Sequence, residues 1–227
     1  MRKVATVAAL TAALATGCGS DGNSTTGLSD GGAATPPSER LSNEQFAAAE
    51  RLYEATLPMD DLDESTDPEQ LRAGVAEVVR TCDEVATTDD ELLQALTSNC
   101  ERLTAFADAA VAAEGCSAPD ECAEQIVAAA DGMDRIVSAA EDAVPTVEAA
   151  VAAGSCRDLL TSRRQMALFG EMTNGFRELG EAIGAGDDEA ILAAATRTER
   201  AVARAERFPD AHETLAEFRR ACAPASP

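Results

Sequence analysis

The chain has no tryptophan, one tyrosine, six phenylalanines and one histidine among its 227 residues. A core with so few aromatic side chains is built mainly from Ala, Leu and Val, which suits close helix packing better than a β-sandwich. A single histidine cannot make a typical zinc site, and no nucleophile with a partner motif can be assigned to it. We therefore interpret His212, which lies near Glu213, as a surface or capping residue.

Several sequence patterns are also missing. No stretch alternates apolar and polar residues with β-branched enrichment, so no strand is predicted. No Walker loop, dinucleotide fingerprint or haem-attachment motif is present, and we expect neither a cofactor nor enzymatic activity.

The 41 acidic residues outnumber the 18 basic ones, for a net charge of −23, and Lys3 is the only lysine. This charge disfavours binding to nucleic acid.

The first 18 residues have the layout of an export signal. A basic tip, Met1-Arg2-Lys3, precedes an apolar stretch from Val4 to Leu14 and the small-residue run Leu14-Ala15-Thr16-Gly17-Cys18. The apolar stretch is too short for a membrane span, which needs about 20 residues. The run that ends at Cys18 resembles the lipobox of bacterial lipoproteins.

That resemblance implies removal of residues 1–17 as a signal peptide and attachment of a lipid to Cys18. The protein would then be exported and held by its lipid on the cell membrane, facing outside the cytoplasm. Gly19 implies the outer membrane if the cell has two, because Asp at that position would imply retention at the inner one. Residues 18–40 are rich in Gly, Ser, Thr, Asp and Pro and are predicted to form a disordered tether.

The remainder is predicted to be one all-α domain over residues 41–223, followed by a loose tail at 224–227. Short connections between amphipathic segments indicate an antiparallel bundle of five to seven helices. We expect Pro58 to end the first helix, Pro145 to kink or break the fourth, and Asn174-Gly175 to be a candidate interruption of the fifth. The predicted helices cover about 42–56, 67–85, 88–114, 119–144, 155–183, 188–207 and 210–222.

Six cysteines follow Cys18. An even number beyond an export signal favours three disulfides over a metal site, since no Cys-x2-Cys pair is present. Placing the cysteines by height on straight, alternating helices predicts the pairs Cys82–Cys156, Cys100–Cys222 and Cys116–Cys122. On the same assumption, a Cys82–Cys100 bridge would be out of level by roughly 10 Å, more than a disulfide spans.

Two charged features are candidate binding sites. Asp61, Asp63, Ser65 and Asp67 place oxygen atoms at alternate positions, as in the first half of a calcium loop, although Thr66 and Arg72 replace the Gly and Glu of that pattern. A solvated loop that ends in a helix cap is the alternative. Arg197, Arg200, Arg204 and Arg207 form one basic stripe on a helix, which either pairs with acidic neighbours or binds an anionic partner.

Charge is unevenly divided along the chain. Residues 42–150 contain 26 acidic and 5 basic residues, whereas residues 151–227 contain 12 and 10. From these features we expect a non-catalytic, lipid-anchored envelope protein that binds a protein partner or acts as a scaffold. The alternative is a binder of a small ligand or of a calcium-like cation. The sequence makes no prediction of the oligomeric state.

Overall fold

A computed structural model describes residues 40–60, 67–205 and 207–224. The described part contains helices and no strand, which confirms the all-α prediction. Seven helices have 12 to 32 residues, and two have seven residues each. The helices are α2 (Asn43–Asp60), α3 (Pro68–Ala86), α4 (Glu91–Thr97), α5 (Glu101–Gly115), α6 (Pro119–Ala150), α7 (Ser155–Thr161), α8 (Arg163–Ala185), α9 (Asp188–Ala205) and α10 (Ala211–Cys222).

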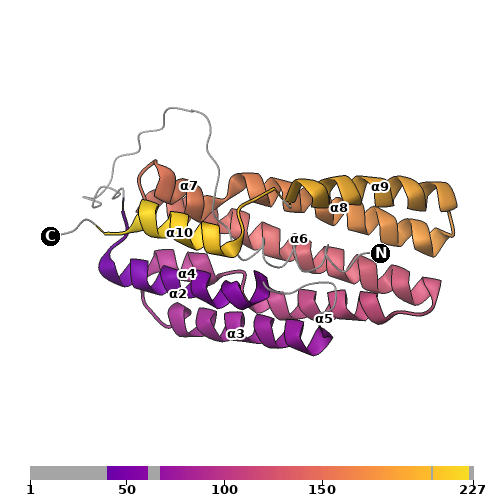
Figure 1. The fold of residues 1–227 in the computed structure, drawn as a ribbon, viewed down its shortest axis with the longest axis horizontal. Coiled ribbons are helices and arrows are strands. Elements are labelled where there is room, and N and C mark those ends of the chain that lie inside the picture. Colours follow the sequence, from indigo (N-terminus) through magenta and orange to yellow (C-terminus); the bar gives the residue numbers. More distant parts are fainter. Residues whose placement is uncertain (1–39, 61–66, 206, 225–227) are drawn as a thin grey trace.

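The helices lie along one long axis, with α6 in the centre (Figure 1). Helices α2 to α5 lie on one side of α6, whereas α8 and α9 lie on the other. Helices α7 and α10 close one end of the bundle. That end also holds both described chain termini, since the amide of Leu41 donates to the carbonyl of Cys222 at 3.4 Å. We call this end the terminal pole.

Helices α2 and α3 start close to the predicted residues, and each start is stabilised by a helix cap. Ser42 Oγ accepts from the amide of Gln45, while Gln45 Oε1 accepts from the amide of Ser42. Asp67 caps α3 in the same reciprocal way with Gln70. These caps satisfy amides of the first turn that have no partner within the helix. Helix α4, by contrast, begins after Asp90 and not at Thr88 as predicted.

Neither proline ends its helix, so the predicted end of α2 near Thr56 is wrong. Pro58 lies inside α2, and α6 continues through Pro145 to Ala150. Both prolines are exposed, and so are Glu54 and Glu141 four residues earlier. The carbonyls that lose a helical donor are therefore close to water, which lowers the penalty of an interior proline.

The structure joins Cys116 to Cys122, as predicted. The predicted Cys82–Cys156 pair is wrong, because Cys82 is bonded to Cys100 with a Cα–Cα distance of 6.2 Å. The prediction assumed a straight helix from Thr88 to Glu114. That helix breaks between α4 and α5, where the amide of Cys100 bonds to Thr97 only three residues earlier. The break and the later start of α4 bring Cys100 level with Cys82.

The predicted Cys100–Cys222 pair is wrong as well, because Cys222 is bonded to Cys156. The prediction assumed alternating helices, so that the last helix would run opposite to the one before it. Figure 1 shows instead that α10 continues in the direction of α9 towards the terminal pole. The end of α10 therefore meets the start of α7, and the Cα atoms of Cys156 and Cys222 lie 4.8 Å apart.

Two large apolar clusters and a small third one fill the bundle. The larger one joins α3, α5, α6 and α8 and includes Leu103, Met133, Ile136 and Phe169, all at most 2% exposed. The second large one lies at the terminal pole, where the ring of Phe218 stacks on Phe46 and also contacts Tyr53. Three aromatic residues thus meet where α10 packs against α2, and the other four belong to the larger cluster.

Candidate functional site

A crevice between α4 and α6 is the best-formed candidate binding site. Its open part has a volume of about 440 Å³, and a smaller, less open inner end of about 20 Å³ adjoins it. Ala95, Ser98 and Ala143 line both parts, so the two spaces share part of their wall. The small side chains of alanine leave this space open, because they do not fill the gap between the two helices.

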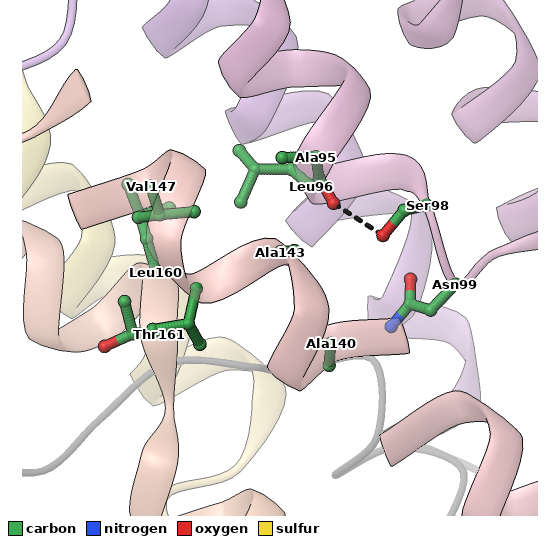
Figure 2. Close-up of a pocket in the computed structure, with 10 residues that line it drawn as sticks. Ala95, Leu96, Ser98, Asn99, Ala140, Ala143, Val147, Leu160 and Thr161 are labelled. Atoms are coloured by element: carbon green, nitrogen blue, oxygen red, sulfur yellow. Dashed lines mark hydrogen bonds between the residues drawn. The ribbon is translucent and has the colours of Figure 1, made fainter. Parts of the chain in front are cut away.

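The inner end combines apolar walls with polar groups. Leu96, Val147 and Leu160 converge on it from α4, α6 and α7, and Thr161 lies beside Leu160 (Figure 2). The hydroxyls of Ser98 and Thr161 donate to Ala95 at 2.8 Å and to Arg157 at 3.0 Å, respectively. An inner end of this size holds about one water-sized group.

Asn99 supplies the polar group that is left without a partner there. The residue as a whole is 8% exposed, and its amide nitrogen is directed towards Ala140 (Figure 2). This nitrogen donates to no atom of the described residues. Its Oδ1 lies 3.8 Å from Cys100 Sγ, which has no proton to donate because it belongs to a disulfide. The amide lines the inner end of the crevice and is therefore able to donate to an acceptor placed there.

The open part of the crevice has a negative lining. Glu91 on α4 and Asp142 on α6 contribute exposed carboxylates that make no ion pair with the described residues. Arg102 also lines this part, but its guanidinium donates to the carbonyl of Ser98 at 2.6 Å and lies 3.5 Å from the carboxylate of Glu101. Because Arg102 already lies beside the carboxylate of Glu101, it does not neutralise the carboxylates of Glu91 and Asp142.

The lining groups can hold a ligand by charge and hydrogen bonds. Gln94 and Thr146 add an amide and a hydroxyl to the carboxylates of Glu91 and Asp142. Sequence reasoning missed this site because Glu91 and Asp142 are far apart in the chain and lie on different helices. Asn99 carried a signal, since it follows Leu96 by three residues and therefore occupies the apolar face of the predicted helix.

The predicted cation loop is largely outside the described residues, which exclude Asp61, Asp63 and Ser65. Asp67 is described, and its Oδ1 accepts from the amide of Glu69 at 2.9 Å as the cap of α3. Among the described residues, no group of three His, Cys, Asp or Glu side chains is arranged to hold a metal ion. Cys18 and the signal sequence also lie outside the described ranges.

The predicted arginine stripe is divided into two lines, and its last member, Arg207, lies in the turn after α9 because the helix ends at Ala205 and not near residue 207. Arg197 pairs with Glu178 and Arg204 with Glu171, both on α8. Arg200 and Arg207 are exposed and form no ion pair with the described part of the chain. We call the first two the inner line and the other two the outer line. The inner line therefore forms ion pairs between α9 and α8, whereas the outer line forms no ion pair with the described residues.

His212 is exposed in the first turn of α10, where Asp210 is the capping residue. None of the helices in the described ranges combines the length and the apolarity that a bilayer crossing requires. Comparison of the chain with protein-family models, curated proteins and solved structures finds no match.

Proposed function

We propose that this protein is an exported, lipid-anchored, non-catalytic binding or scaffold module of the bacterial envelope. The observation that carries the proposal is the lipobox-like run ending at Cys18, ahead of a domain whose six cysteines form three disulfides. Disulfides form and persist in oxidising compartments outside the cytoplasm. A domain braced in this way supports export of the chain, and Cys18 is the cysteine left for the lipid.

Lipidation is tested on the full chain in a bacterial host by labelling with a radioactive fatty acid and by membrane fractionation. The unchanged protein should carry the label and sediment with membranes. Cys18→Ser should lose the label and leave the membrane fraction. The double variant Cys116→Ser/Cys122→Ser removes cysteines elsewhere and should keep the label. A label that persists in Cys18→Ser would contradict the proposal.

The outer line supports binding of an acidic protein partner. Arg200 on α9 and Arg207 just after it are exposed, and α9 also carries Leu192, which is 71% exposed. Arginine is common at protein interfaces, where its planar fork pairs with carboxylates. An envelope protein with an acidic patch would complement this surface. Contact with nucleic acid is not proposed, given the acidic body.

Charge reversal separates the two lines. Arg200→Glu/Arg207→Glu should abolish capture of an envelope partner by the full chain while leaving the melting temperature unchanged. Arg197→Glu/Arg204→Glu is the matched control, because it reverses the same charge but faces Glu171 and Glu178. That variant should lower the melting temperature. Equal loss of stability in both variants would assign the outer line a structural role instead.

Small-ligand or cation binding is the second candidate function, and the α4–α6 crevice is the observation that favours it. For a calcium-like cation, the predicted ligands are Asp61, Asp63, Ser65 and Asp67. Calorimetric titration with calcium should give heat and raise the melting temperature if the loop binds the ion. Absence of both effects would remove the ion and leave the crevice as the ligand site.

A further inference from the structure

We propose that the α4–α6 crevice binds a small aliphatic molecule with a primary ammonium group at one end and a hydrogen-bond-accepting oxygen at the other. This inference deepens the ligand-binding alternative above. It does not depend on the lipid anchor, because binding in the crevice and attachment at Cys18 are measured separately.

The ammonium end is assigned by the charge of the open part. Glu91 and Asp142 approach it from opposite helices, while the guanidinium of Arg102 is occupied by Ser98 and Glu101. An ammonium group donates three hydrogen bonds, and the carboxylates together with Gln94 and Thr146 supply acceptors for them. The net charge of −23 adds a long-range attraction for cations.

The oxygen end is assigned by Asn99. As a residue, Asn99 is more than nine-tenths buried, and its amide nitrogen donates to no acceptor among the described residues. Because this donor lines the inner end and has no protein partner, a ligand that brings an acceptor to this point gains the bond without displacing an existing one. The inner end of about 20 Å³ admits a group the size of a hydroxyl or carbonyl oxygen.

The alanines that line the crevice indicate that the middle of the ligand is apolar. Ala95 and Ala143 line both the open and the inner part and present only methyl groups. A short methylene chain matches this surface in width and polarity. A bare metal ion fits less well, because no three metal-ligating side chains are grouped in the described residues.

The test is a nuclear magnetic resonance titration of the isotope-labelled full chain with 4-aminobutan-1-ol. We expect saturable shifts of the Asn99 side-chain amide and of the Ala95 and Ala143 backbone amides. Butan-1-ol and butanoate, which lack the ammonium group, should cause no such shifts. Butylamine, which lacks the oxygen, should bind more weakly and leave the Asn99 side chain unshifted.

Matched variants check the charge. Asp142→Asn should weaken binding by roughly threefold to tenfold, because an oriented charge-assisted hydrogen bond is lost. Glu141→Gln removes the same charge one residue earlier, on an exposed side chain outside the crevice lining, and should leave the affinity unchanged. Glu91→Gln, in the lining at the start of α4, and Asp89→Asn, two residues earlier and outside the lining, form a second such pair. All four positions are exposed, so folding should be preserved.

Three results would overturn the proposal. One is the absence of saturable shifts at Asn99, Ala95 and Ala143. Another is equal binding of butanoate, which would exclude selection for a cation. The last is an equal loss of affinity in Asp142→Asn and Glu141→Gln, which would reduce the interaction to the general charge of the surface. Equal binding of butylamine would overturn the role given to Asn99.

Discussion

At the scale of single residues, Ser162 forms the turn in the backbone between α7 and α8. It joins α7 to α8 with φ of 39° and ψ of 33°, in the left-handed region, although it carries a side chain. It is 1% exposed, and its hydroxyl donates to Leu159 at 3.3 Å. Non-glycine residues hold such angles only where the surrounding packing imposes them.

Replacing Ser162 with glycine or alanine should separate the backbone penalty from the loss of the hydroxyl. Both variants lose the bond to Leu159, but only alanine keeps a Cβ atom at a positive φ. We expect Ser162→Gly to be more stable than Ser162→Ala by about 1 kcal/mol. Urea denaturation of both variants measures the difference. Greater stability of the alanine variant would contradict the strain at this position.

Glu77 is a carboxylate whose pKa the structure lowers. Arg80, one turn later on α3, donates to its carboxylate and lowers the pKa of Glu77 below its ordinary value of 4.5. The folded pKa is thus lower than the unfolded one. The stability that this pair contributes is therefore present at neutral pH and is lost as the pH falls through the folded pKa.

A titration of the Glu77 carboxyl by carbon-detected magnetic resonance should give a midpoint below 4.5. In Arg80→Gln the pKa should rise towards the ordinary value, because the hydrogen bond from the guanidinium is removed. Arg135→Gln, on α6, removes an exposed arginine that forms no ion pair with the described residues and serves as the control. An unchanged midpoint in Arg80→Gln would show that another group lowers the pKa.

At the scale of helices, glycine sets how closely the long elements approach. A Cβ atom added at Gly180 of α8 would lie 2.7 Å from Val127 and 3.0 Å from the carbonyl of Ala123, both on α6. Gly175 meets Thr198 of α9 in the same way, at 2.6 Å. The helix continues through Asn174-Gly175, where we expected a candidate interruption, and the glycine provides room for α9.

Gly180→Ala should lower the free energy of unfolding by about 1–3 kcal/mol, because the added methyl overpacks the contact between α6 and α8. Gly170→Ala on the same helix is the matched control, since nothing lies within 4 Å of the added atom. It should raise stability by about 0.5–1 kcal/mol through helix propensity. Chemical denaturation of the two variants should therefore give changes of opposite sign.

At the scale of the whole molecule, the disulfides tie segments at very different separations. Cys116–Cys122 spans 6 residues at the turn between α5 and α6, whereas Cys156–Cys222 spans 66 and holds the last helix on the bundle. A longer loop restricts the unfolded chain more strongly, so its closure contributes more to stability. The long-range bridge is also buried beside Phe218 in the cluster at the terminal pole.

Removal of the two bridges by paired Cys→Ala substitutions should follow this order. We expect Cys156→Ala/Cys222→Ala to cost about 4 kcal/mol and Cys116→Ala/Cys122→Ala about 2 kcal/mol, from the dependence of closure entropy on loop length. Thermal unfolding under non-reducing conditions compares the variants. A larger loss on removing Cys116–Cys122 would show that the short bridge holds more of the fold than its loop length implies.

The sequence by itself determined the helical class, the order of the helices and most of their starts. These properties depend on residues that are neighbours in the chain, such as Ser42 with Gln45 or Asp67 with Gln70. The Cys116–Cys122 pair was predictable for the same reason, since its partners flank one short turn. The export signal and Cys18 remain predictions, because they lie outside the described residues.

Tertiary structure alone decided the other two disulfides, the division of the arginine stripe and the crevice. Each depends on where a helix bends or which way it runs, and small local changes there move distant residues by several ångströms. The break before Cys100 and the onward direction of α10 are examples. Glu91, Asn99 and Asp142 come together because α4 packs on α6, and no local pattern in the chain encodes that contact.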